Sequence, residues 1–351
     1  MSDQPVLEIN NLEKYFDQST SILDTLLRRR QGQVQAVDGV SLTLEENDSQ
    51  GLIGESGCGK STLLMTLMGL HEPTGGEIKF RGEDLADFSR SDWKEFRSNV
   101  QIIFQDPFNS LDPKMTVKES LLEPLKIHNM DNKDERVRRA LRQAELNPPE
   151  RYLNSVPSQL SGGEKQRVSI ARALVVDPEV ILADEPVSML DVSTQAAVLE
   201  LLSELIDDLG LSMLYISHDL STVAYVCEQI HVMYLGRIVE SAQTLDIVED
   251  PKHPYTQALI DAIPVPDPHH ARERVQIDGS PRDPVDMGGG CRFRDRCPER
   301  MEVCEKTPEF INEGDRQVAC HLYYDHEEHT GEETGTQTET PVAEATDGGT
   351  Q

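Results

Sequence analysis

The residues from Gly54 to Ser61 have the types and the spacing of a phosphate-binding loop. They read Gly-Glu-Ser-Gly-Cys-Gly-Lys-Ser and match the pattern G-x-x-x-x-G-K-S/T. In such a loop the glycines let the backbone wrap a polyphosphate closely, Lys60 reaches the outer phosphates, and Ser61 offers its hydroxyl to Mg²⁺. A short apolar run at residues 50–53 precedes the loop, and apolar residues recur at helical spacing after it. A strand that enters a helix through glycines is an anion site, so the sequence predicts a nucleotide-binding protein.

Further polar residues follow apolar runs and suit phosphate chemistry. Gln105 ends one run, where an amide can ligate a metal or position a water. Asp184 and Glu185 end another; an Asp there holds the Mg²⁺ shell in nucleotide folds, and the adjacent Glu can accept a proton from an attacking water. His218 ends a third run and can contact a γ-phosphate, although a lone His at a strand end is more often structural. Ser161 to Gly163 open a helical stretch, which makes them a second candidate phosphate site or an ordinary capping turn.

These side chains need buried strands to hold them. Apolar runs predict strands at residues 6–16, 34–44, 50–53, 77–80, 100–104, 180–184 and 213–217. The chain between residues 117 and 160 is predicted to be mainly helical, interrupted by prolines. An aromatic residue at the end of the first strand, Phe16 or Tyr15, can stack on an adenine ring or simply belong to the core.

The composition limits the partners and the location. The net charge of -30 over 351 residues leaves no basic face for nucleic acid. No stretch resembles a signal peptide or reaches the ~20 apolar residues of a membrane span, so we expect a soluble chain or one held at a membrane through a partner. Carboxylates are spread through the chain, which indicates either an ordinary acidic surface or, as we favour, adaptation to concentrated salt.

The motifs occur together and in a fixed order that resembles the ATP-binding subunits of ABC transporters. The phosphate loop, Gln105, the Leu-Ser-Gly-Gly-Glu segment at 160–164, the strand ending in Asp184-Glu185, and His218 match that family's Walker A, Q-loop, signature, Walker B and switch histidine. The resemblance extends over residues 6 to 325. It implies an ATPase that uses ATP and Mg²⁺.

The resemblance also implies a role for each matching residue. Two such subunits face head to tail, so Ser161 and Gly163 would act on the ATP held by the other subunit. Glu185 would be the base for the attacking water, with His218 and Lys60 at the γ-phosphate. ATP would be bound by Phe16, Gly54, Glu55, Ser56, Gly57, Cys58, Gly59, Lys60, Ser61, Thr62, Gln105, Ser161, Gly162, Gly163 and Asp184, and Mg²⁺ by Ser61, Gln105 and Asp184.

More narrowly, the chain resembles the oligopeptide/dipeptide permease branch. This resemblance rests on four segments: the phosphate loop, residues 105–113, the Asp-Glu-Pro-Val-Ser run at 184–188 and the His-Pro-Tyr-Thr run at 253–256. The branch implies a non-identical sister ATPase, two membrane-spanning permease subunits, an extracellular solute-binding protein, and a place at the cytoplasmic face of the membrane. The acidic composition indicates a salt-adapted, haloarchaeal-like source.

The expected fold is α/β: a P-loop NTPase core of the ABC ATPase type, with a mixed sheet and flanking helices, plus a helical subdomain and a small Cys-rich C-terminal domain. The expected division is residues 1–86 for the first part of the core with an insertion at 17–33, 87–160 for the helical subdomain, 161–250 for the second part of the core, 251–324 for the C-terminal extension, and 325–351 for a disordered acidic tail.

Four of the six cysteines lie in that extension: Cys291, Cys297, Cys304 and Cys320. A reducing cytoplasm disfavours disulfides, whereas four thiolates are the usual ligands of a 4Fe–4S cluster or a structural Zn²⁺. The spacing lacks the C-x-x-C pairs common in zinc sites, and neighbouring arginines, Arg292 and Arg296 among them, are expected to stabilise thiolates. The contexts also resemble the cysteine motif of the permease branch, in which some members bind a 4Fe–4S cluster. We therefore expect a 4Fe–4S cluster, with zinc or free thiols as alternatives.

Two other functions fit parts of the sequence. The same ATPase could drive an importer of nickel or short sugars, since no residue here touches the cargo. A soluble ABC ATPase of DNA repair or translation would carry a second cassette or a long coiled-coil insertion, and neither is recognisable in these residues.

Overall fold

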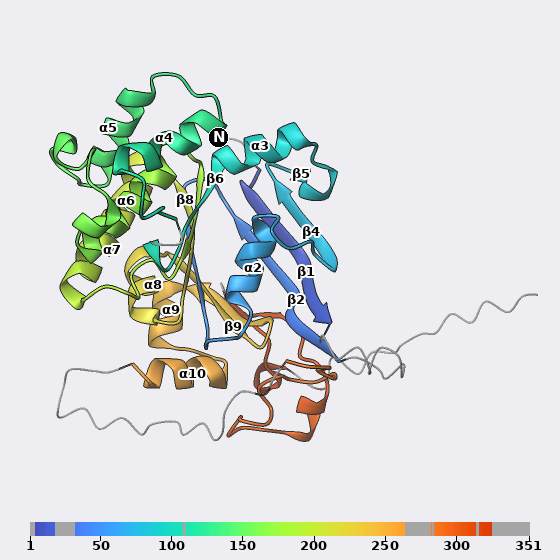
Figure 1. Cartoon of the computed structure of the whole chain (residues 1–351). Helices are drawn as coiled ribbons and strands as arrows, with labels where there is room; N and C mark the ends of the chain where they lie inside the picture. The colour runs from blue at the N-terminus through green and yellow to red at the C-terminus, as the bar shows by residue number, and fades with distance from the viewer. Residues whose placement is uncertain are drawn as a thin grey trace, which may run out of the picture.

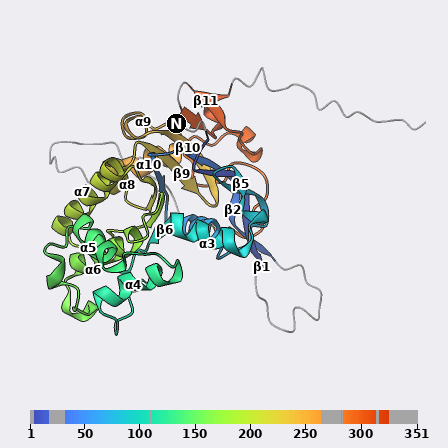
Figure 2. The ribbon, with the colours of Figure 1, turned by 90° about the horizontal axis from the view of Figure 1, so that it is seen from above.

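The computed structural model describes residues 4–17, 32–107, 110–263, 282, 284–313 and 316–324. Apart from its end residues, the insertion expected at 17–33 lies outside them, as does the acidic tail expected at 325–351. The described residues form two sheets with helices around them. Figure 1 shows helices α4 to α7 on one side of the molecule and strands β1, β2 and β4 on the other, and Figure 2 shows the same division from above.

The larger sheet carries the ends of the predicted phosphate-binding segments at one edge. Its order is β11-β12-β10-β9-β3-β8-β7-β6, and the strands from β9 to β6 are parallel. These parallel strands are β3 (Ser49–Ile53), β6 (Val100–Ile103), β7 (Val180–Asp184), β8 (Ser212–Ser217) and β9 (Gln229–Tyr234). Both faces are covered, which explains their nearly continuous apolar sequences. Because the strands run the same way, the segments that follow β3, β6, β7 and β8 leave the sheet at the same edge.

The smaller sheet is antiparallel and has the order β2-β1-β4-β5. It consists of β1 (Leu7–Asp17), β2 (Gln33–Leu44), β4 (Gly75–Phe80) and β5 (Glu83–Asp84). One hydrophobic core joins this sheet to α2 (Lys60–Leu67), α3 (Arg90–Asn99) and one face of the larger sheet. The phosphate loop, which lies between β3 and α2, is therefore supported by both sheets.

The remaining helices pack around a second core on the other face of the larger sheet. Those before β9 are α4 (Val117–Ile127), α5 (Lys133–Gln143), α6 (Gly162–Leu174), α7 (Val192–Leu209) and α8 (Leu220–Val226). Thr116 and Ser161 begin α4 and α6 with capping boxes completed by Glu119 and Glu164. None of the helices in the described ranges is long and apolar enough to cross a membrane.

The C-terminal residues continue the larger sheet. After β10 (Arg237–Gln243) come α9 (Thr244–Glu249), α10 (Pro254–Asp261), β11 (Ile311–Glu313) and β12 (Arg316–Val318). Strand β12 pairs with β10, and Cys291, Phe293 and Cys304 belong to the second core. The Cys-rich segment, residues 284–324, is thus joined to the ATPase-like sheet by hydrogen bonds and by a shared core, because its own apolar residues are too few to enclose a core alone.

Candidate functional site

The phosphate loop is held in a conformation that only glycine allows at two positions. Gly59 has φ 112°, and a Cβ there would lie 2.0 Å from the Ala36 carbonyl oxygen; a Cβ on Gly54 would lie 2.2 Å from the Met233 carbonyl oxygen. The close approach of β2 and β9 to the loop therefore requires these glycines. Lys60 begins α2, and its Nζ donates to the carbonyl oxygens of Gly54 at 2.6 Å and Glu55 at 3.1 Å.

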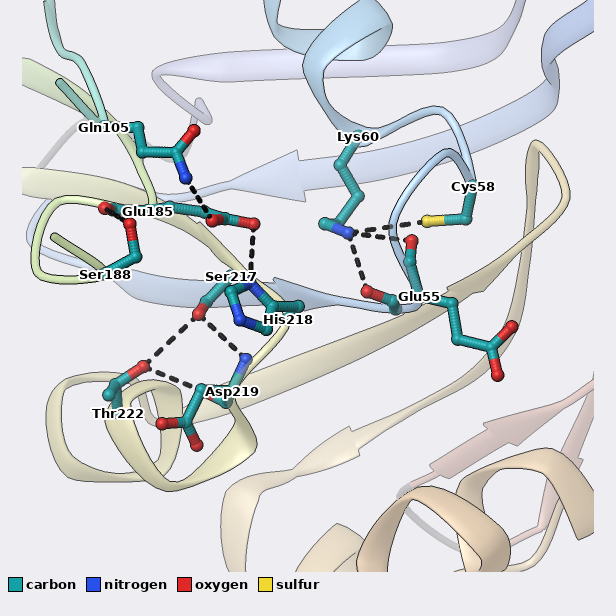
Figure 3. A network of polar contacts seen from close by, with 11 residues as sticks. Glu55, Cys58, Lys60, Gln105, Glu185, Ser188, Ser217, His218, Asp219 and Thr222 are labelled. Carbon is teal, nitrogen blue, oxygen red and sulfur yellow. Dashed lines mark hydrogen bonds and ion pairs between the residues drawn. The ribbon is translucent and has the colours of Figure 1, made fainter. Parts of the chain in front are cut away.

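Glu185 lies opposite Lys60, where two other strand ends meet it (Figure 3). Its Oε2 accepts a hydrogen bond from Gln105 Nε2 at 2.9 Å, and its Oε1 lies 2.8 Å from His218 Nδ1. Three residues predicted from separate segments thus form one polar cluster. Ser188 donates through its hydroxyl to the Glu185 carbonyl oxygen at 3.1 Å, which fixes the turn after β7.

Asp184 ends β7 beside Glu185. Burial raises the pKa of its carboxyl group above the ordinary value, the negative charge of Glu185 adds to this, and the Lys60 ammonium opposes it. A carboxylate with so little water around it is stabilised by a cation. The neighbouring Ser61 hydroxyl and Gln105 amide oxygen are the kinds of ligand that Mg²⁺ takes alongside one carboxylate, so the residues fit that ion.

A cavity of about 770 Å³ joins these groups. It is lined by Phe16, Val34, Ala36, Gly54, Glu55, Ser56, Gly57, Gly59, Lys60, Ser61, Thr62, Gln105, Asp184, Glu185, His218, Leu259 and Pro284. The predictions missed Val34, Ala36, Leu259 and Pro284, none of which carries a recognisable motif. Cys58, which was predicted to bind the nucleotide, is buried away from the cavity, and its sulfur accepts a hydrogen bond from Lys60 at 3.7 Å.

The two aromatic residues predicted as alternatives for stacking on adenine lie in different surroundings. Phe16 lines the cavity, with His71 edge-on at a ring-centroid distance of 5.3 Å. Tyr15 points elsewhere, because its hydroxyl donates to Asp38 Oδ1 at 2.5 Å. Of the two, only Phe16 is available to a ligand in the cavity.

The Ser161 to Gly163 segment lies outside this cavity. Ser161 caps α6: its backbone N–H donates to Glu164 Oε2 at 2.8 Å, and its Oγ accepts from the Glu164 N–H at 3.3 Å. Ser161 and Gly162 are exposed. Within one chain, the structure therefore does not bring the signature segment to the phosphate loop.

The four C-terminal cysteines are free thiols that influence one another. Burial, with a smaller contribution from the charges of the other cysteines, raises the pKa of Cys297 to about 11 and of Cys320 to about 12. The Cys291 N–H donates to the Cys304 carbonyl oxygen at 2.9 Å, so these two residues lie side by side. Across the described part of the chain, however, no group of three or more His, Cys, Asp or Glu side chains is arranged to hold a metal ion.

The arginines among these cysteines mostly face the core. Arg292 donates to Asp38 Oδ2 and to the Leu235 carbonyl oxygen, and Arg296 forms an ion pair with Glu55. Carboxylates thus compensate Arg292 and Arg296, which were expected to stabilise the thiolates. Arg294, a third arginine of that expectation, does act on a cysteine, because its charge opposes the rise that burial gives the pKa of Cys291.

The fold defines an ATPase of the ABC type, because it places the phosphate loop with Lys60 opposite the strand-end residues Glu185 and His218 (Figure 3). A family model described as "ABC transporter" matches residues 37–188, and one described as "Oligopeptide/dipeptide transporter, C-terminal region" matches residues 239–304. The structure resembles the ATP-binding cassette MJ0796, solved as a dimer bound to ADP and Pi, with a TM-score of 0.58 and 29% identity over 68% of this chain and 98% of that one. It also resembles cbiO1 from Clostridium perfringens, with a TM-score of 0.59 and 26% identity over 71% and 92% of the two chains.

Comparison with two named relatives shows to which branch of the ABC ATPases the chain belongs. The chain is 44% identical over 327 residues to "Putative oligopeptide transport ATP-binding protein YkfD" of Bacillus subtilis, covering 91% of this chain and 96% of that one. It is 40% identical over 319 residues to "Dipeptide transport ATP-binding protein DppF" of Escherichia coli, covering 90% and 94%. The chain therefore belongs to the ATP-binding proteins of the oligopeptide/dipeptide transporter family. It is a membrane-associated ATPase subunit whose ATP hydrolysis is coupled to transport.

Proposed function

We propose that this chain energises the import of peptides. The observation that carries the proposal is the match of residues 239–304 to the C-terminal region of oligopeptide/dipeptide transporters. The solved cassette MJ0796 is covered over 98% of its length by only 68% of this chain. The names of the relatives point the same way. The chain would act at the cytoplasmic face of the membrane, with a non-identical sister ATPase, two permease subunits and an extracellular peptide-binding protein.

The site residues suggest how ATP is cleaved. Lys60 would bind the β- and γ-phosphate oxygens. Ser61, Gln105 and Asp184 would hold Mg²⁺, which would neutralise phosphate charge. Glu185 takes a proton from the water that attacks the γ-phosphorus, and the bond to the ADP oxygen breaks in line with it. The contact with His218 Nδ1 at 2.8 Å keeps the Glu185 carboxylate oriented.

Two subunits would complete each ATP site. Ser161 and Gly162 are exposed at the start of α6, and Met189 and Val192, which follow Glu185 in the chain, are 66% and 81% exposed. Exposed apolar residues beside a polar helix N-terminus suit a subunit interface. We propose that Ser161, Gly162 and Gly163 contact the ATP bound by the sister subunit, and that residues 87–160, with α4 and α5, dock on the permeases.

Reconstitution tests the cargo directly. The chain would be co-purified with its sister ATPase and permeases in lipid vesicles, and ATP hydrolysis measured with the binding protein loaded with peptide, nickel or a short sugar. Stimulation by the peptide-loaded form alone supports a peptide importer. Stimulation by nickel or sugar reassigns the cargo, and rapid hydrolysis by the isolated chain with no response to membrane partners supports a soluble ABC ATPase.

We also propose that Cys291, Cys297, Cys304 and Cys320 hold a 4Fe–4S cluster, with Zn²⁺ as the alternative. The backbone hydrogen bond between Cys291 and Cys304 supports the proposal for two of the four residues, and bound metal would relieve the cost of ionising buried thiols. Anaerobic purification with iron, sulfide and zinc analysis tests this. About four irons and four sulfides per chain support the cluster, one zinc supports a structural tetrathiolate, and neither means that the cysteines are ordinary thiols.

A further inference from the structure

We propose that Arg296 and Tyr255, both from the C-terminal part of the chain, are positioning residues for the phosphate loop and act through Glu55. This inference rests on the proposed nucleotide site and adds to it two residues that were not predicted to act there. Glu55 is the second residue of the loop and belongs to the lining of the nucleotide cavity. A carboxylate at this place is unexpected, because its negative charge repels a bound polyphosphate.

Arg296 compensates that charge with a bidentate ion pair. Its Nη1 donates to Glu55 Oε2 at 2.9 Å, and its Nη2 donates to Glu55 Oε1 at 3.1 Å. The two side chains are only 11% and 28% exposed, so water screens the pair less than it would on the surface. Figure 3 shows the Glu55 carboxylate turned away from Lys60 and Glu185. The ion pair thus keeps negative charge off the phosphate side of the loop.

Tyr255 fixes the backbone of the same residue. The Glu55 N–H donates to the Tyr255 hydroxyl oxygen at 2.9 Å. The Tyr255 ring is fully buried and packs against Tyr234 and Phe293, with ring centroids 4.6 and 5.5 Å away. Phe293 lies between two of the cysteines in sequence, so the Cys-rich segment supports the loop through this aromatic cluster as well as through Arg296.

Neither of these two contacts involves Lys60. Lys60 donates to the carbonyl oxygens of Gly54 and Glu55 and to the Cys58 sulfur, and it can turn an N–H toward phosphate without breaking the contacts of Glu55 with Arg296 and Tyr255. The amide and carboxylate of Glu55 stay anchored by groups outside the loop. A loop held from outside loses less conformational freedom when it binds its ligand, which favours affinity.

Nucleotide titrations of the full-length chain test the proposal. Binding of a fluorescent ADP analogue with Mg²⁺ would be compared for wild type, Arg296→Gln, Glu55→Gln and the double variant. We expect Arg296→Gln to weaken binding about tenfold, as loss of a charge-assisted bidentate pair implies. Adding Glu55→Gln to Arg296→Gln should restore most of the affinity that Arg296→Gln loses, because the repelling charge is then gone.

A matched control removes the same charge from the same segment. Arg300 pairs with Glu305 and is half exposed, so Arg300→Gln should bind as wild type does. Tyr255→Phe removes one hydroxyl from an intact aromatic cluster and should weaken binding, whereas Arg296→Lys should bind more tightly than Arg296→Gln. These two variants keep the test decisive if Arg296→Gln does not fold.

The outcomes separate this proposal from the function itself. Wild-type protein that binds no nucleotide would contradict the ATPase assignment. Wild type that binds nucleotide, together with folded Arg296 and Tyr255 variants of equal affinity, would overturn only the positioning role. A double variant as weak as Arg296→Gln would also overturn it, because Arg296 would then act through something other than Glu55.

Discussion

Glu185 adopts a backbone conformation that its residue type rarely takes. Its φ is 44°, in the left-handed region, where a residue other than glycine costs on the order of 1–3 kcal/mol. The Glu185 N–H donates to the Ile216 carbonyl oxygen at 2.8 Å, which ties this turn to β8. The strain therefore directs the carboxylate to the place where Gln105 and His218 contact it.

Replacing Glu185 should separate nucleotide binding from cleavage. We expect Glu185→Gln to lower ATP hydrolysis about 10²- to 10⁴-fold, because the amide cannot take the proton from the attacking water. The Kd for ATP should stay close to that of wild type, since the side-chain shape is kept. Steady-state hydrolysis and equilibrium binding measure the two effects. Glu204→Gln, on the exposed face of α7, is the control, and hydrolysis by Glu185→Gln at the wild-type rate would exclude Glu185 as the base.

Asp184 should make the nucleotide-free fold depend on pH. Burial raises the pKa of its carboxyl group, so the folded state holds this proton more tightly than the unfolded state, whose ordinary pKa is 3.8. The ionised group then destabilises the fold at pH values above the raised pKa, and this penalty disappears as the pH falls below 3.8. Without Mg²⁺ and nucleotide, Asp184→Asn should therefore be more stable than wild type at pH 7, and the difference should close toward pH 4.

Urea unfolding at several pH values measures this difference. Asp207→Asn removes an exposed carboxylate from α7 and serves as the control. Asp184→Asn less stable than wild type at pH 7 would contradict the prediction. The same variant should bind Mg²⁺-nucleotide more weakly, because it has lost the carboxylate assigned to the metal.

Among the elements, β2 and the Cys-rich segment are joined by a buried ion pair. Arg292 and Asp38 are 3% and 10% exposed, and Asp38 also accepts from Arg237 Nε at 2.8 Å and from the Tyr15 hydroxyl. We expect Asp38→Asn to lower the free energy of unfolding by ~3 kcal/mol, because it leaves the Arg292 charge buried without a counterion. Chemical denaturation measures the loss.

Glu179→Gln provides the comparison for that variant. It breaks an ion pair with Arg81 in which both side chains are nearly half exposed, so the loss should stay below ~1 kcal/mol. Equal losses in the two variants would mean that burial does not govern the strength of the Asp38 contact.

The elements of the nucleotide site could largely be predicted from the sequence. Buried parallel strands appear in the sequence as apolar runs, and Gln105, Glu185 and His218 each follow one. The family resemblance assigned all three residues to one ATP site. The pairing of β12 with β10 was not predictable, since β12 has only three residues and no alternating pattern. The contact of Arg296 with Glu55 joins residues 241 positions apart and depends on the packing of Phe293. Because Arg296 lies next to Cys297 in sequence, it was expected to stabilise the thiolates, whereas it pairs with Glu55.

At the scale of the whole molecule, the net charge of -30 should make stability depend on salt. We propose that the chain is adapted to concentrated salt, as haloarchaeal proteins are. Repulsion between carboxylates weakens as the screening length falls from about 10 Å at 0.1 M salt to about 3 Å at 1 M. Thermal unfolding should therefore move to higher temperature as KCl is raised to molar concentration, with most of the gain below about 1 M. Unfolding at increasing sucrose concentration is the control, because it shows the stabilisation that any solute excluded from the protein surface produces. A midpoint temperature of unfolding that KCl leaves unchanged would argue against salt adaptation.

The long sequence distance between the phosphate loop and its supports affects how the protein is made. Glu55 emerges early in translation, whereas Arg296 follows 241 residues later, and Arg292 follows its partner Asp38 by 254. A nascent chain that already contains the whole phosphate-loop sequence still lacks the group that neutralises Glu55. High nucleotide affinity would then arise only near the end of synthesis. An unfinished or C-terminally truncated subunit would then bind nucleotide more weakly than the complete chain does.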